Sequence, residues 1–104
     1  MRQISVEEAR DLLAGPERPQ LLDCRQGWEH DLCHLPGDVH IPLGDLEDRL
    51  NELDPARPVI VYCHAGVRSI NGAVMLERAG FTAMSMRGGI EQWSLRIDPT
   101  VPRY

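Results

Sequence analysis

The feature that most restricts the fold of this chain is an unbroken apolar run, Val59–Tyr62, which contains no charged or strongly polar residue. A strand with one face in solvent alternates apolar and polar residues, whereas a strand buried on both faces does not. Pro55 and Pro58 bracket the turn that precedes the run. The run therefore predicts a central strand of a parallel sheet that is covered on both faces.

Helical and strand-like patterns alternate along the rest of the chain. Ser5 and Glu8 form a capping box that predicts the start of a helix, which ends at Gly15 and Pro16. Further strands are predicted at residues 20–24, 39–41 and 81–86, and further helical segments at residues 28–31, 43–53, 69–79 and 90–94. We interpret residues 1–4 as a lead into the first helix. Alternating elements with short connections predict βαβ units, a parallel sheet and one α/β domain over residues 1–104.

The composition excludes several classes of function. Sixteen acidic residues against eleven basic ones give a net charge of −5, which argues against binding to nucleic acids or to anionic membranes. All the basic residues are arginines, so chemistry that needs a lysine is excluded. The sequence shows no signal peptide or membrane-spanning run, and we expect a cytoplasmic protein and, at this size, a monomer.

The cysteines and histidines give no metal-binding pattern. The three cysteines, Cys24, Cys33 and Cys63, include no C-x-x-C pair, which argues against a zinc site, and their odd number argues against a disulfide scaffold. The four histidines show no tight ligand spacing, so we expect no metal. We interpret Trp28 and Trp93 as packing anchors.

The segment after the apolar run carries the most chemistry. It joins the predicted central strand to a helix, and parallel sheets bind their ligands at the carboxyl ends of their strands. The segment comprises Cys63, His64, Ala65, Gly66, Val67, Arg68 and Ser69. Backbone N–H groups, a helix start and the Arg68 guanidinium all attract negative charge, and they favour the thiolate, the nucleophilic form of cysteine. The segment therefore predicts a nucleophile, Cys63, in an anion-binding loop.

Most buried cysteines are small apolar residues rather than nucleophiles. For Cys63, the glycine, the arginine and the helix start that follow within six residues favour the nucleophile. For Cys24 and Cys33 we expect unreactive thiols, although Cys24, just past a strand end, could resolve a persulfide or sulfenate on Cys63. His64 is either a polar loop residue or a second cation near the thiolate.

The segment from Cys63 to Ser69 resembles the active-site loop of single-domain rhodaneses, the thiosulfate-type sulfurtransferases. Three further segments are similar to motifs of that family and occur in the same order. They are LDCR at residues 22–25 followed by Glu29, HLPGDVHIP at residues 34–42, and GGIEQW at residues 88–93. The resemblance covers nearly the whole chain, with two departures: Cys33 stands where the family usually has glycine, and Asp38 where it usually has alanine.

The resemblance implies a rhodanese-like α/β fold, a five-stranded parallel sheet with helices on both faces, and covalent sulfur transfer in two steps. We expect no cofactor. Cys63 would take a sulfane sulfur as a persulfide and pass it to a thiophilic acceptor. The substrate cradle would comprise His64, Ala65, Gly66, Val67, Arg68 and Ser69, and structural support would come from Asp23, Arg25, Glu29 and His34. The expected donor is a small anion such as thiosulfate, or a protein persulfide.

Two alternatives remain open at this point. A cysteine-based phosphatase or arsenate reductase also surrounds an anion with a thiolate and an arginine, but its loop has five residues between them, and this loop has four. A sulfur-relay module for a sulfur-carrier protein is the second alternative. Residues 98–104 are similar to the tails of rhodanese domains fused to sulfur-carrier-activating enzymes, which makes a protein sulfur acceptor possible.

Overall fold

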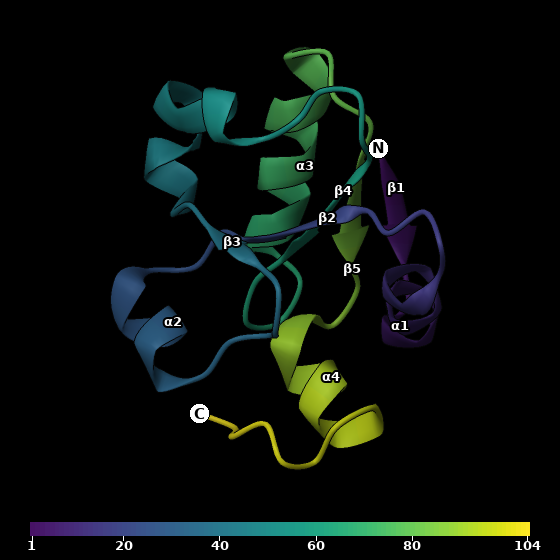
Figure 1. Cartoon of the computed structure of the whole chain (residues 1–104). Helices are drawn as coiled ribbons and strands as arrows, with labels where there is room; N and C mark the ends of the chain where they lie inside the picture. The colour runs from purple at the N-terminus through teal and green to yellow at the C-terminus, as the bar shows by residue number, and fades with distance from the viewer.

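A five-stranded parallel sheet runs through the computed structural model, which describes residues 1–104 (Figure 1). The strands, in the spatial order β1-β5-β4-β2-β3, are β1 (Arg2–Ile4), β2 (Gln20–Asp23), β3 (Val39–His40), β4 (Val59–Tyr62) and β5 (Ala83–Met86). The helices are α1 (Val6–Ala14), α2 (Gly27–Leu32), the 3-10 helix η1 (Leu43–Glu52), α3 (Arg68–Arg78) and α4 (Gly89–Arg96). The fold class predicted from the sequence is confirmed. No helix of the chain is long and apolar enough to span a membrane.

The apolar run at residues 59–62 forms the central strand, as its pattern predicts. β4 pairs in parallel with β2 on one side and with β5 on the other, and all four of its residues are buried. Its side chains alternate between two separate core clusters. Val59 and Val61 face the first cluster, whereas Ile60 and Tyr62 face the second. Both clusters are apolar, which explains why the strand has no polar alternation.

Each core cluster is covered by its own pair of helices. Ala73 and Leu76 of α3 and Leu46 of η1 close the first cluster. Val6 of α1 and Ile90 of α4 close the second. Figure 1 shows the same division, with α3 and η1 on one side of the strands and α1 and α4 on the other.

Three local predictions differ from the structure. Residues 2–4 form an edge strand, β1, that pairs with β5, rather than a lead into the first helix. The segment predicted as an amphipathic helix at residues 43–53 is the 3-10 helix η1, and Arg49 interrupts it with non-helical dihedral angles. The final helix, α4 (Gly89–Arg96), extends beyond the predicted residues 90–94 at both ends. A three-residue strand is too short to show the alternation that identifies strands.

The second glycine of the Gly-Gly motif, Gly89, is required by a close approach between α4 and the loop after β4. Its φ is +61°, and a Cβ atom there would lie 2.4 Å from the carbonyl oxygen of His64. The approach allows the first turn of α4 to bind the loop: the N–H groups of Ile90 and Glu91 donate to the carbonyls of Cys63 and His64 at 2.9 and 3.1 Å. The Gly-Gly motif therefore holds the backbone of Cys63 and His64, where the loop begins, against α4.

We predict that Gly89→Ala destabilises the protein by about 3 kcal/mol, because left-handed backbone strain adds to a clash with two carbonyl groups. Urea unfolding at equilibrium measures the loss. Gly80→Ala is the matched control: φ is also positive there, at +95°, but nothing lies within 4 Å of the added methyl group. The control should lose only about 1 kcal/mol, and equal losses for the two variants would contradict the close-approach argument.

Candidate active site

The loop after β4 curls around the thiol of Cys63. The backbone N–H of Gly66 lies 3.1 Å from Cys63 Sγ, and that of Ser69, in the first turn of α3, lies 3.4 Å away. Gly66 has a φ of +98°, and a Cβ there would lie 2.8 Å from the backbone nitrogen of Gly88. Glycine is therefore needed for the loop to turn its amides toward the sulfur. Cys63 is 1% exposed, so the thiol lies at the bottom of the loop.

Two buried hydroxyl groups, of Ser69 and Ser85, connect the Cys63 thiol to the sheet through hydrogen bonds. The Cys63 thiol donates to Ser69 Oγ at 3.4 Å, and Ser69 Oγ lies 2.8 Å from Ser85 Oγ on β5. Ser69 does not cap α3: Val67 is the N-cap and makes no side-chain hydrogen bond. Sequence reasoning missed Ser85, although it is the one polar residue in an otherwise apolar strand, Ala83–Met86.

The Arg68 guanidinium is held by Glu29 of α2 and is not a free cation beside the thiol. Arg68 Nη1 and Nη2 donate to the two carboxylate oxygens of Glu29 at 2.6 and 2.8 Å. The Tyr104 hydroxyl also donates to Glu29 Oε2. These hydrogen bonds, chiefly those from Arg68, outweigh burial and lower the pKa of Glu29 to about 2. The pair joins the loop to α2, so both residues position the loop.

A second ion pair, between Arg25 and Asp23, is fully buried beside the first. Arg25 donates twice to the Asp23 carboxylate, at 2.9 and 2.8 Å, and once to the Cys33 carbonyl, at 2.6 Å. Its remaining terminal nitrogen donates to the Tyr104 hydroxyl at 3.0 Å. Burial opposes ionisation of Asp23, but hydrogen bonds from Arg25 and His30 hold the pKa of that carboxyl below its usual value. The Tyr104 hydroxyl thus links the two ion pairs.

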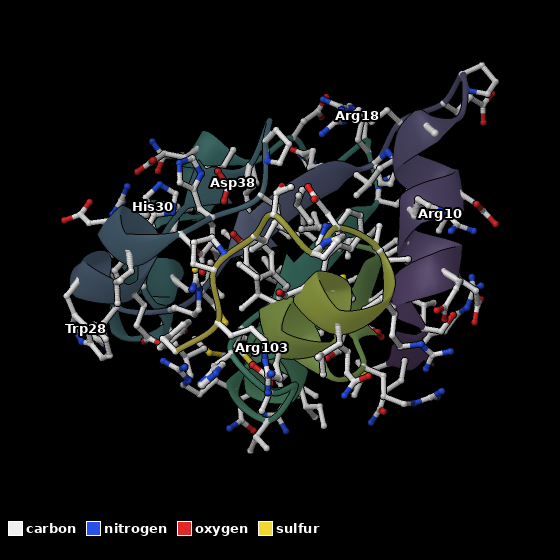
Figure 2. All side chains as sticks on the ribbon, turned by 90° about the horizontal axis from the view of Figure 1, so that it is seen from below. Arg10, Arg18, Trp28, His30, Asp38 and Arg103 are labelled. Atoms are coloured by element: carbon white, nitrogen blue, oxygen red, sulfur yellow. The ribbon has the colours of Figure 1, made fainter.

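Aromatic side chains pack against one side of the loop. The His64 ring stacks on Tyr104, with centroids 4.0 Å apart and planes at 14°, and His64 Nε2 lies 3.7 Å from Glu91. Trp28 meets the Tyr104 ring edge-on but is 62% exposed, so its interpretation as a packing anchor is wrong; Figure 2 shows it at the periphery. Trp93 does pack against the second core cluster. His64 and Tyr104 therefore form one wall of the site.

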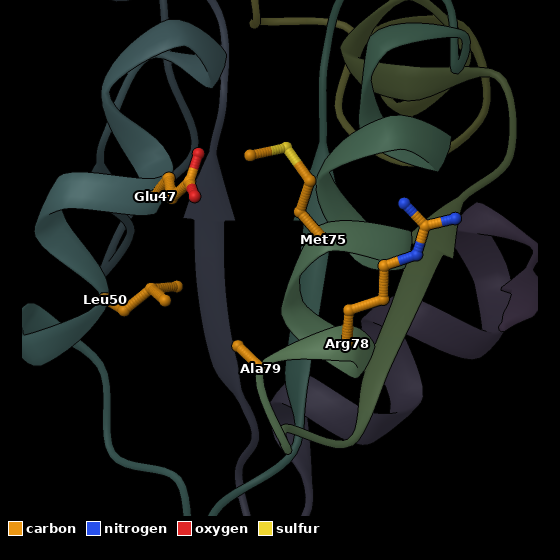
Figure 3. Close-up of a pocket in the computed structure, with 5 residues that line it drawn as sticks. All are labelled: Glu47, Leu50, Met75, Arg78 and Ala79. Atoms are coloured by element: carbon orange, nitrogen blue, oxygen red, sulfur yellow. The ribbon is translucent and has the colours of Figure 1, made fainter.

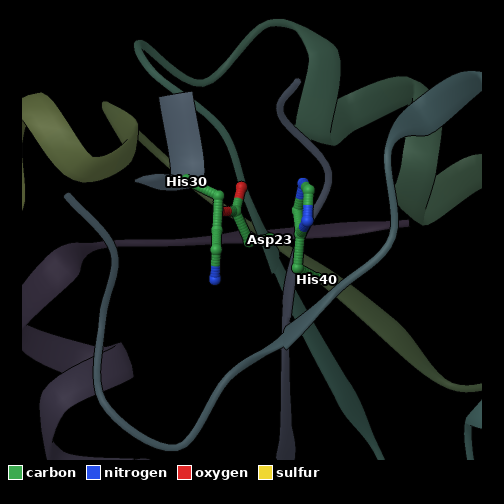
Figure 4. A group of neighbouring side chains, drawn as sticks. All are labelled: Asp23, His30 and His40. Atoms are coloured by element: carbon green, nitrogen blue, oxygen red, sulfur yellow. The ribbon is translucent and has the colours of Figure 1, made fainter. Parts of the chain in front are cut away.

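Three histidines that are separated in sequence come together near Asp23. Figure 4 shows two of them, His30 and His40, with Asp23. His30 stacks between His34 and His40, and its Nδ1 lies 2.9 Å from Asp23 Oδ2. Two groups of three offer possible metal ligands within 4.8 Å of one another: Asp23, His30 and His40, and His30, His34 and Asp38. In the first group both Asp23 oxygens are bonded to Arg25, and His40 Nε2 lies 2.8 Å from the Arg25 carbonyl. In the first group, the ligand atoms of Asp23 and His40 are therefore already hydrogen-bonded to Arg25.

A groove lies between η1 and the C-terminal half of α3 (Figure 3), away from the thiol. Its lining residues are Glu47, Leu50, Met75, Arg78 and Ala79. Cys63 lies at the opposite end of α3, where Ser69 is in the first turn of the helix. The groove is therefore separate from the site at the loop.

The comparisons with known proteins agree with this geometry. Residues 5–96 match the model of the rhodanese-like domain, so the chain belongs to the rhodanese-like domain family. It is 32% identical over 118 residues to the adenylyltransferase and sulfurtransferase MOCS3 of Arabidopsis thaliana, covering 97% of this chain and 25% of that protein. The crystal structure of a rhodanese-like domain protein from Staphylococcus aureus superposes with a TM-score of 0.87 at 26% identity, over 100% of this chain and 99% of that one.

Several relatives are longer than this chain. The chain is 34% identical over 93 residues to YrkF of Bacillus subtilis (strain 168), covering 88% of this chain but only 50% of YrkF. It therefore spans half of YrkF and a quarter of MOCS3. Membership of the family supports sulfur transfer as the class of activity. It does not identify the sulfur donor or the acceptor.

We predict that Glu29→Gln costs about 2 kcal/mol of unfolding free energy at pH 7, because Arg68 loses a charged partner. The native pKa of Glu29 is depressed, so its contribution is complete above the unfolded value near 4.5 and disappears as the pH falls through about 2. The difference between wild type and variant, measured by urea unfolding, should shrink over that range.

The matched control is Glu52→Gln, which breaks the exposed pair with Arg49. An exposed pair contributes little, so this variant should lose less than about 1 kcal/mol. A Glu29→Gln deficit of the same size at pH 7 and at pH 2 would rule out the ionised pair as its cause.

Proposed function

We propose that the chain is a sulfurtransferase that carries a sulfane sulfur on Cys63 as a persulfide. The donor is a small anion such as thiosulfate, or a protein persulfide, and the acceptor is a thiophile. One observation carries the proposal: the N–H groups of Gly66 and Ser69 both point at Cys63 Sγ at the start of an 11-residue helix. Such amides stabilise a thiolate before the reaction and the anionic sulfur after it.

In the first half-reaction, the Cys63 thiolate attacks the outer sulfur of thiosulfate. A bond forms between Cys63 Sγ and that sulfur, the sulfur–sulfur bond of thiosulfate breaks, and sulfite leaves with the electron pair. The loop amides meet the negative charge of both the donor and the persulfide. Arg68 serves this step by holding the loop against Glu29, rather than as an unpaired cation.

In the second half-reaction, a nucleophile attacks the outer sulfur of the persulfide. The bond to Cys63 Sγ breaks and its electron pair returns to Cys63 as a thiolate, which Gly66 and Ser69 stabilise as the leaving group. Val67 of the loop is 71% exposed, and the exposed Trp28 meets the ring of Tyr104, which stacks on His64 of the same loop. This apolar rim supports a protein as the acceptor.

We predict that Cys63→Ser lowers thiocyanate formation from thiosulfate and cyanide at least about a thousandfold, because serine removes the nucleophile. Sulfite release and thiocyanate formation are measured together, and unfolding in urea checks that the variant remains folded. Cys33→Ser is the matched control and should leave both rates unchanged, since the Cys33 thiol donates to the Pro102 carbonyl at 3.4 Å and lies in the second core cluster, on the opposite face of the sheet from Cys63.

Two outcomes would contradict the proposal. Full activity of Cys63→Ser would show that no covalent intermediate forms on this cysteine. Hydrolysis of an aryl phosphate by the wild-type protein, dependent on Cys63 and without sulfite release from thiosulfate, would instead establish the phosphatase alternative.

A further inference from the structure

Cys24 and Cys63 occupy neighbouring positions at the ends of adjacent strands. β2 and β4 are parallel, with Leu22 opposite Val61 and Asp23 opposite Tyr62. The ladder continues one residue further, because the N–H of Cys24 donates to the Tyr62 carbonyl at 3.1 Å. Neighbouring strands lie about 4.8 Å apart, and cysteines joined by a disulfide have Cα atoms about 4.4 to 6.8 Å apart. The backbone therefore places the two cysteines within bonding range.

Both side chains also lie on the same face of the sheet. Cys24 and Cys63 belong to the core cluster beneath α3, whereas Tyr62 belongs to the cluster on the opposite face. α3 contacts both positions on one side of the helix: Ser69 touches Cys63, and Gly72, one turn later, leaves room beside Cys24. A Cβ on Gly72 would lie 3.9 Å from Cys24 Sγ. The two thiols thus share one compartment.

We propose that Cys24 is an internal acceptor that resolves the Cys63 persulfide and releases its outer sulfur as hydrosulfide. This inference rests on the proposed function. The loop amides are directed at Cys63 Sγ and would hold the outer sulfur on the loop side, whereas Cys24 lies on the core side. A thiolate attack of this kind requires entry opposite to the departing sulfur.

The step balances without an external oxidant. The Cys24 thiolate forms a bond with Cys63 Sγ, the bond from Sγ to the outer sulfur breaks, and that sulfur leaves with the electron pair as hydrosulfide. The two cysteines are oxidised to a Cys24–Cys63 disulfide by two electrons, and the sulfane sulfur is reduced to sulfide. A dithiol reductant then returns both cysteines to thiols. The net activity is reductive release of sulfide from the donor.

Protonation of Cys24 gives the step a distinctive pH dependence. Burial and the neighbouring Cys63 raise the pKa of the Cys24 thiol to about 12. The titratable and charged groups around it are Cys63, Asp23 and Arg68, whereas η1 and the inner face of α3 present Leu43 and Gly72. Because the thiolate is the attacking form, resolution should accelerate about tenfold per pH unit below that pKa.

The test follows the reduced protein after one addition of thiosulfate, by intact mass and by sulfide release. In Cys24→Ser the persulfide, one sulfur heavier, should last at least about tenfold longer than in wild type. Wild type should pass to a species two hydrogens lighter than the dithiol, releasing one sulfide per chain, at a rate that rises between pH 7 and 9. Cys33→Ser, whose thiol lies outside this compartment, should match wild type.

The outcomes separate this inference from the proposed function. A wild-type persulfide as durable as that of Cys24→Ser would overturn the internal transfer and leave sulfur transfer through Cys63 intact. Absence of sulfur on Cys63 in both proteins would overturn the proposed function, and the internal transfer with it. Peptide mapping of the wild-type product without reduction must show a Cys24–Cys63 bridge, which keeps the test valid if Cys24→Ser folds poorly.

Discussion

The fold around the site depends on one buried charge, the guanidinium of Arg25. A charged group with no access to water must have its hydrogen bonds satisfied within the protein, or the structure that buries it is unstable. Arg25 meets this requirement with three partners: Asp23 at the end of β2, the Cys33 carbonyl after α2, and the Tyr104 hydroxyl in the distant C-terminal segment. One side chain therefore fixes the relative positions of three segments around the sheet edge.

Tyr104 connects the buried Arg25 guanidinium to the loop after β4. Its hydroxyl accepts from Arg25 and donates to Glu29, which binds the Arg68 guanidinium. Its ring stacks on His64. The loop is thus held on two sides, by a carboxylate from α2 and by an aromatic ring from the C-terminal segment. Because Glu29 neutralises Arg68, an anion bound at Cys63 would be met chiefly by the backbone amides of Gly66 and Ser69, as the proposed function requires.

Sequence reasoning recovered the features that local patterns determine. The continuous apolar run identified β4, the capping box identified α1, and the glycine and arginine near Cys63 identified the loop. It missed features that depend on tertiary contacts. β1 exists because residues 2–4 pair with β5, and the histidine stack exists because the chain between residues 30 and 40 folds back on itself. The pairing of Arg68 with Glu29 joins residues 39 positions apart, a separation that carries no local signal.

The relation between the two thiols follows from sheet geometry rather than from any motif. Cys24 and Cys63 are separated by 38 intervening residues, and only the parallel register of β2 and β4 makes them neighbours. The parallel arrangement that brings a strand end to an anion-binding helix start also brings the end of the adjacent strand to the same edge. A cysteine at that second position lies on the core side of the nucleophile, where solvent acceptors do not compete. Burial keeps it protonated, so it would act slowly and only on a persulfide that no external acceptor has already discharged.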